Sequence, residues 1–149
     1  MGYIEELRAI VEHRPLILVG SVVIITDSAG RMLLQQRRYP YGVWGLPGGL
    51  MELGESVEDT TRREVHEETG LRIGKLALIG VFSGSQYYVK AGNGDEFYIV
   101  TSAFHTSDFD GSLQVDYLES LNFSFFDTSN LPSPILSNHK TIIDAYLAK

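Results

Sequence analysis

Apolar residues near the start of the chain follow a helical period. They are spaced three and four apart among charged residues, which predicts a short amphipathic helix that ends before Pro15 and packs by its apolar face. Its apolar positions are Ile4, Leu7, Ile10 and Val11. After a pair of prolines late in the chain, the same period returns and predicts a closing helix around Ile142 and Tyr146.

Between these helices, stretches rich in β-branched and aromatic residues predict strands. Residues 16–26 and 31–38 read as two strands joined by a turn at Asp27 to Gly30. Later strands are expected over residues 76–83, 96–106 and 121–126, with turns at 91–95 and 108–112. Residues 39–54 contain many glycines and prolines, so we expect an ordered loop or a bent strand there. The fold class is therefore α/β with a mixed sheet.

One further helix has boundary signals at both ends. Ser56 is followed three residues later by Asp59, which resembles a capping box with the shorter acid, and Gly70 supplies a carboxyl-terminal cap. These signals bracket a helix from about Val57 to Thr69.

Composition and charge narrow the classes of protein. The 149 residues predict one domain, 1–149, and 44% hydrophobic residues are enough for a core. Twelve basic against nineteen acidic residues give a net charge of −7, so a nucleic-acid partner is not expected. The absence of cysteine excludes disulfides, thiolate metal sites and a cysteine nucleophile. With no secretory signal and no apolar stretch of about 20 residues, we expect a soluble, cytoplasmic protein with no membrane partner.

The central helix carries three glutamates, Glu64, Glu67 and Glu68, on one arc of its surface. Like charges at this spacing cost a few tenths of a kcal/mol per pair in an exposed helix. Two interpretations follow: a solvated acidic face partly compensated by neighbouring arginines, or a site for a hard cation such as Mg²⁺, which prefers oxygen ligands.

The surrounding sequence favours the cation site. Residues 49–71 read GLMELGESVEDTTRREVHEETGL and fit the pattern G x5 E x7 R E U x E E x G U, where U is a bulky aliphatic residue. This segment resembles the Nudix box of the Nudix hydrolase superfamily at every fixed position. The segments 33–38, 44–49 and 123–132 resemble other parts of the same family, which extends the likeness to the whole chain.

The resemblance implies a fold, a reaction and a metal. The fold would be the Nudix α/β/α sandwich around a central mixed sheet. The reaction would be hydrolysis of a pyrophosphate bond in a nucleoside diphosphate linked to another moiety, with Mg²⁺ or Mn²⁺ required. By position in the motif, the metal ligands would be Glu64, Glu67, Glu68 and the carbonyl of Gly48.

The remaining box residues would support these ligands. Arg63 would brace the glutamates without touching the metal, and Glu55 would pair with Arg63 or share an outer metal. Gly49 would allow close backbone approach, and Gly70 would end the helix.

Several roles stay open at this level. The general base is Glu67, Glu64 or, as in relatives that use a later loop, Glu119, which reads equally well as one more acidic loop residue. Arg37 and Arg38 follow a strand toward the glycine-rich segment and would bind phosphate or form surface ion pairs.

Substrate and partners are less defined. Tyr87 and its neighbour lie near a spacing that accompanies diadenosine polyphosphate substrates in some Nudix subfamilies, although strand packing explains them too. ADP-ribose, nucleotide sugars and nucleoside triphosphates are the other candidates. The alternative function is a catalytically silent nucleotide sensor with the same fold. Such sensors usually lose box glutamates, whereas this chain keeps them. Capped RNA is disfavoured as a substrate by the negative net charge. Because homodimers are common in the family, the resemblance also offers a homodimer as a partner state. The four histidines receive no role.

Overall fold

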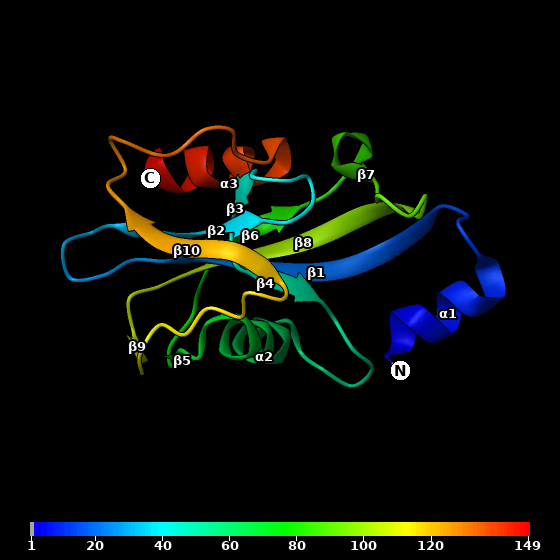
Figure 1. Cartoon of the computed structure of the whole chain (residues 1–149), viewed down its shortest axis with the longest axis horizontal. Helices are drawn as coiled ribbons and strands as arrows, with labels where there is room; N and C mark the ends of the chain where they lie inside the picture. Colours follow the sequence, from blue (N-terminus) through cyan, green and yellow to red (C-terminus); the bar gives the residue numbers. More distant parts are fainter. Residues whose placement is uncertain (1) are drawn as a thin grey trace.

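The computed structural model describes residues 2–149 and forms a layered α/β structure (Figure 1). The elements in chain order are α1 (Tyr3–Val11), β1 (Leu16–Ile25), β2 (Met32–Arg37), β3 (Trp44–Gly45), β4 (Gly48–Leu50), α2 (Val57–Thr69), β5 (Arg72–Ile73), β6 (Ala77–Phe82), the 3₁₀ turn η1 (Ser85–Tyr87), β7 (Tyr88–Lys90), β8 (Glu96–Thr106), β9 (Phe109–Asp110), β10 (Ser120–Phe126) and α3 (Ser137–Leu147).

The main sheet is mixed, as the sequence predicts. Its strand order is β4-β1-β8-β6, and β7 also pairs with β8. The two longest strands, β1 and β8, run parallel from the pair Leu16 and Phe97 to the pair Ile25 and Thr106. The neighbouring strands β4, β6 and β7 are antiparallel to them. A second sheet, β10-β2-β3, completes the strand layer.

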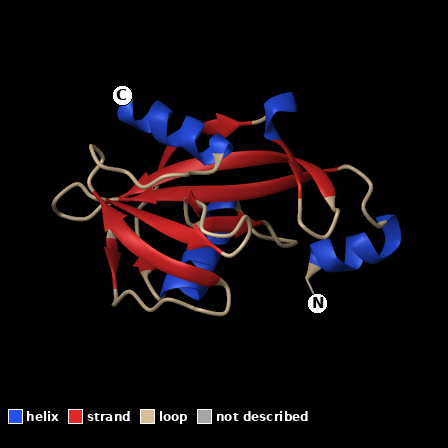
Figure 2. Ribbon diagram, turned by 45° about the horizontal axis from the view of Figure 1, so that its top comes forward, coloured by secondary structure: helices blue, strands red, loops and turns tan. Residues whose placement is uncertain are grey.

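Helices cover both sides of this layer, so the expected α/β/α sandwich is confirmed (Figures 1 and 2). Successive strand residues point to opposite faces, and β1 is apolar at consecutive positions because both of its faces are covered. Ile24 packs in a core cluster with Ile142 of α3, whereas Ile25 packs in a separate cluster with Val65 of α2. The central strands therefore link two cores.

The structure adds short strands to the expected elements. Residues 39–54, expected as an ordered loop or a bent strand, contain β3, which pairs with β2, and β4, which pairs with β1. The short strands β5, β7 and β9 were not expected, since two or three residues carry no readable alternation. Figure 1 shows β5 and β9 near α2, where they pair with each other.

The first helix forms where its period predicts, and its apolar face is only partly covered. Among the residues of α1, Ile4, Leu7 and Val11 are half-buried, whereas Ile10 is 76% exposed. Polar contacts add to the attachment of α1: the Arg8 guanidinium donates to the carbonyl of Glu96 at 2.7 Å and pairs with Asp95 at 3.5 Å. Within residues 2–149, no helix is both long and apolar enough to span a membrane.

Candidate active site

Helix α2 is fixed at both ends by the predicted caps. The Ser56 hydroxyl accepts from the Asp59 amide at 3.0 Å while the Asp59 carboxylate accepts from the Ser56 amide, which completes a capping box. At the other end, Gly70 is left-handed with φ +77°. The buried Thr61 hydroxyl donates to Ser21 on β1 at 2.8 Å, so the helix is anchored against the central strand.

The three glutamates of α2 open onto one cavity of about 970 Å³. Its lining joins the carboxylates to residues from β2, β4 and the loop before β10. The lining residues are Gln35, Arg37, Arg38, Tyr39, Gly48, Gly49, Glu64, Glu67, Glu68, Asp116, Leu118 and Glu119. The structure thus brings the residues expected to hold metal into one cavity. Arg37, Arg38 and Glu119 line the same cavity.

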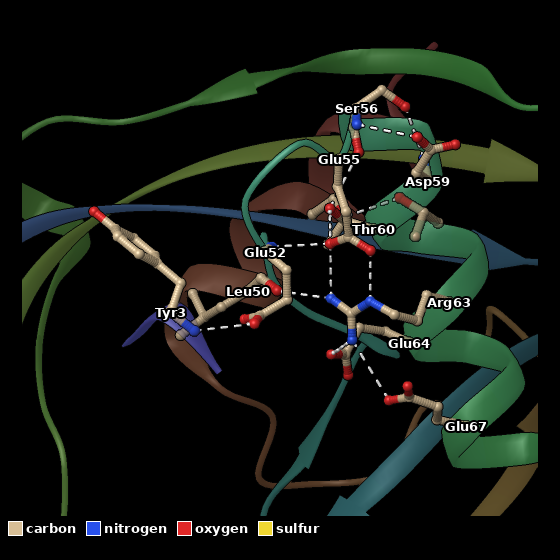
Figure 3. Close-up of polar contacts among 12 residues, drawn as sticks. Tyr3, Leu50, Glu52, Glu55, Ser56, Asp59, Thr60, Arg63, Glu64 and Glu67 are labelled. Atoms are coloured by element: carbon tan, nitrogen blue, oxygen red, sulfur yellow. Dashed lines mark hydrogen bonds and ion pairs between the residues drawn. The ribbon is translucent and has the colours of Figure 1, made fainter. Parts of the chain in front are cut away.

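Arg63 lies at the centre of a polar network (Figure 3). Its Nε donates to Glu55 Oε2 at 2.6 Å and its Nη2 donates to Glu55 Oε1 at 2.9 Å. Nη1 reaches Glu64 Oε1 at 2.6 Å and lies 3.5 Å from Glu67 Oε2, and Nη2 also donates to the Leu50 carbonyl. One guanidinium therefore ties the loop before α2 to two of its carboxylates.

These contacts change the titration of both partners. Hydrogen bonding to Arg63 is the main reason that the pKa of Glu55 falls to about 2, with the Glu52 amide and the Thr60 hydroxyl adding to it. The pKa of Arg63 is raised in turn by its bond to Glu55. Glu55 is therefore ionised at neutral pH and committed to Arg63.

Glu68 has the opposite environment. Burial raises the pKa of Glu68 to about 8, and the nearby charge of Glu64 adds to the increase. The Gly48 amide, which donates to Glu68 Oε1 at 3.2 Å, and the charge of Arg37 lower the pKa only in part. Burial likewise raises the pKa of Glu64. The positive charge near these two carboxyl groups is thus too small to keep both ionised. A cation bound in the cavity would favour their ionised forms.

The donor set fits a hard divalent cation, because it consists of carboxylate oxygens with backbone carbonyls nearby. As placed in residues 2–149, no three acidic or histidine side chains converge closely enough to hold an ion. The reason is visible in the contacts, since Glu64 is bound to Arg63 and Glu68 to the Gly48 amide.

The two glycines at the cavity allow close approach of other groups. A Cβ on Gly48, where φ is +153°, would lie 2.1 Å from the Ser21 carbonyl oxygen of the paired strand β1. A Cβ on Gly49 would lie 2.4 Å from the Glu64 carboxyl carbon. These two positions therefore admit no side chain without displacing the strand or the glutamate.

Arginines and an acidic loop form the rest of the wall. Arg37 Nε donates to the Tyr39 carbonyl at 2.9 Å, and burial lowers the pKa of Arg37 while the charge of Glu68 opposes this. Arg38 is exposed and holds the carbonyl of Tyr117, with Nε at 3.1 Å. It thereby fixes the loop that carries Glu119, which is itself exposed at the cavity.

A second cavity of about 470 Å³ adjoins the first and shares Arg37, Tyr39, Gly48 and Gly49 with it. Its other walls come mainly from β7, β8 and the start of α3. Those used below are Leu46, Tyr88, Phe97, Ile99 and His139. Carbon surface from aromatic and aliphatic side chains makes this cavity suited to a flat apolar group.

The expectation for Tyr87 is wrong in placement. The 3₁₀ turn η1 directs Tyr87 inward, where it is 3% exposed and packs edge-on against Phe82, and it lines neither cavity. Its neighbour Tyr88 lines the second cavity instead. Because the chain changes from the 3₁₀ turn η1 to strand β7 between these two residues, spacing from the box could not decide which ring faces the cavity.

Sequence reasoning also missed site residues. Gln35, buried in β2 and donating to Ser120 at 2.6 Å, lines the first cavity, and His139 lines the second. The hydrogen-bond partner of His139 is Leu46, which is 93 residues away in the sequence, so no local pattern points to a site role. The only sequence signal was the position of His139 in the first turn of a helix that follows two prolines.

Comparison with known proteins agrees with this geometry. A family model described as the NUDIX domain matches residues 17–146. The chain is 31% identical over 125 residues to the ADP-ribose pyrophosphatase of Methanocaldococcus jannaschii, covering 83% of this chain and 69% of that protein. It is 28% identical over 120 residues to the NAD-capped RNA hydrolase NudC of Vibrio atlanticus, covering 80% and 41%. The crystal structure of a MutT NUDIX hydrolase from Burkholderia pseudomallei matches with a TM-score of 0.74 and 27% identity, covering 89% of this chain and 98% of that one.

Proposed function

We propose that this chain, which belongs to the Nudix hydrolase family and is a pyrophosphohydrolase, cleaves a nucleoside diphosphate linked to another moiety. The reaction would require Mg²⁺ or Mn²⁺. One observation carries the proposal. The cavity that gathers Glu64, Glu67 and Glu68 opens beside a second, largely apolar cavity, and Arg37 stands at their junction. A polar compartment next to an apolar one matches a diphosphate next to a nucleoside.

The diphosphate would lie in the first cavity. When bound, the divalent cation neutralises phosphate oxygens and lowers the pKa of the attacking water. Glu64, Glu67, Glu68 and the Gly48 carbonyl would hold it, with Arg63 fixing the orientation of Glu64. Arg37 has no hydrogen bond from its two terminal nitrogens within residues 2–149, so its fork is available to a phosphate.

The proton of the attacking water would pass to a carboxylate at the cavity. Glu67 and Glu119 are both exposed there, and neither is committed to a short bond in residues 2–149. Glu64 is a poorer candidate because Arg63 holds one of its oxygens at 2.6 Å. A leaving phosphate would then be stabilised by Arg37.

The nucleoside would lie in the second cavity, between the ring of Tyr88 and the aliphatic surface of Ile99 and Leu46. A volume of about 470 Å³ is within the range of small-molecule sites. The named relatives act on compounds that contain an adenosine diphosphate unit, ADP-ribose in one and NAD-capped RNA in the other. ADP-ribose, diadenosine polyphosphates, nucleotide sugars and nucleoside triphosphates are therefore the compounds to test.

The test is chromatographic analysis of products after incubation of the wild-type protein with this panel, in Mg²⁺, Mn²⁺ or chelator. Glu67→Gln tests the cavity, and Glu58→Gln is the matched control, because Glu58 lies exposed in the first turn of the same helix and lines neither cavity. Cleavage that requires metal and is lost only in Glu67→Gln supports the proposal. Tight binding of one compound without cleavage supports the sensor alternative instead.

A further inference from the structure

His139 makes a hydrogen bond that fixes its tautomer. The backbone amide of Leu46 lies 2.9 Å from His139 Nδ1, and an amide N–H can only donate. Nδ1 is therefore the acceptor, and the neutral ring carries its proton on Nε2. Burial, together with the charge of Arg37, lowers the pKa of His139 to about 3, which keeps the ring neutral.

The protonated nitrogen has no partner of its own. Within residues 2–149, Nε2 makes no hydrogen bond, and the single buried side-chain polar atom without a hydrogen-bond partner is Arg8 Nε. His139 Nε2 is therefore not sealed in the core, and the open space beside this residue is the second cavity. The wall of this largely apolar cavity thus includes a neutral N–H donor on a ring that the Leu46 amide holds in place.

We propose that His139 is a specificity-determining residue, whose Nε2–H donates to an acceptor atom of the base in the second cavity. The inference rests on the proposed function, which places the nucleoside there. Bases differ in which edge positions are acceptors and which are donors, so one oriented donor discriminates among them. A ligand that presents a donor or a carbon at that point leaves the N–H unpaired and binds more weakly.

The two ring nitrogens can be tested separately. Asn at 139 places an amide oxygen near the Nδ1 position, which keeps an acceptor for the Leu46 amide and removes the Nε2 donor. Gln places an amide nitrogen near the Nε2 position and gives up the acceptor. His139→Asn therefore tests the proposed recognition of the base, and His139→Gln tests the hydrogen bond to the Leu46 amide.

The probes are AMP, GMP, CMP and UMP, bound in the presence of Mg²⁺ and measured by calorimetry, with the melting temperature at pH 8 measured alongside. For the wild-type protein we expect a preference among the bases of about 10-fold, the size of one hydrogen bond. His139→Asn should lose that preference with little change in melting temperature. His139→Gln should melt lower and keep part of the preference.

The outcomes separate the two claims. A wild-type protein that binds none of the monophosphates overturns the placement of the nucleoside and the inference with it. A preference that persists in His139→Asn overturns the inference alone, and so does equal binding of all four bases by the wild-type protein. If His139→Gln does not fold, the comparison of wild type with His139→Asn still decides.

Discussion

Arg63 and Glu55 are joined by two parallel bonds, from Nε to Oε2 at 2.6 Å and from Nη2 to Oε1 at 2.9 Å. The remaining nitrogen of the same guanidinium reaches Glu64. A planar fork is needed for this arrangement, because an ammonium group cannot bind a carboxylate at two fixed points and a second one beside it.

Arg63→Lys should therefore lower kcat/KM by about 10- to 100-fold, the usual cost of disturbing a group that orients a metal ligand. The measurement is steady-state hydrolysis at saturating Mg²⁺. Arg62→Lys is the control, since the Arg62 side chain makes its only hydrogen bond among the described residues to the Gly74 carbonyl and lines neither cavity. Equal activity in the two variants would contradict the bracing role.

Gly48→Ala should destabilise the protein by at least about 2 kcal/mol, because the new Cβ meets backbone atoms of β1 that cannot move cheaply. Gly54→Ala is the matched control: its φ is +83°, but a Cβ there has nothing within 4 Å. The control should lose only the cost of the backbone conformation, about 1 kcal/mol. Urea unfolding of the two variants measures the difference, and similar midpoints would speak against the close approach.

Metal binding should depend on pH through Glu68. With a pKa near 8, this carboxyl is mostly protonated at pH 7, and ligation requires the ionised form. Apparent Mg²⁺ affinity should therefore rise as pH increases from 6 to 8, by up to about tenfold per unit, and level off above 8. Calorimetric titration in two buffers of different ionisation enthalpy should show proton release at pH 7. Glu68→Gln should abolish that release.

Stability at acid pH should depend on His139. Its pKa is about 3 in the folded protein and near 6.5 when unfolded, so between these values the unfolded chain binds the extra proton. The His139 contribution is thus intact above pH 6.5 and is lost as pH falls toward 3, by up to about 1.4 kcal/mol per unit. Unfolding free energies of wild type and His139→Asn from pH 8 to 4 should diverge below 6.5. Parallel curves would contradict the low pKa.

The general base can be identified by comparing two variants at the same cavity. If the loop carboxylate takes the proton, Glu119→Gln should lower kcat by at least about 100-fold while Mg²⁺ affinity stays near the wild-type value. If Glu67 does so, Glu67→Gln should lower kcat and Glu119→Gln should have little effect. Measuring kcat and Mg²⁺ affinity for both variants separates loss of a base from loss of a ligand.

The sequence predicts helix α2 to the residue, because its signals are local: a capping box at Ser56 and a left-handed glycine at Gly70. The gathering of Glu64, Glu67 and Glu68 at one cavity also follows from helical geometry alone. The second cavity could not be predicted this way. It depends on contacts such as that between Leu46 and His139, which are 93 residues apart, and no periodicity reports them.

Helix α1 illustrates a related limit. Its apolar spacing predicts a packed face, but that face is only half-buried, and the Arg8 guanidinium adds bonds to three backbone carbonyls that the spacing does not predict. Periodicity identifies the element and leaves its attachment undetermined. Tyr87 and Tyr88 differ for a similar reason, since only the conformation of η1 decides which ring faces the cavity.

The central strand β1 separates the two helices that serve the two cavities. Helix α2 packs on one of its faces and supplies carboxylates, whereas α3 packs on the other and supplies the wall around His139. Under the proposed function, bond cleavage and the choice of base are thus carried by separately mutable modules. A library of variants confined to the first turn of α3 and to β7 should change the selectivity among nucleotides and leave the carboxylates of α2 unchanged.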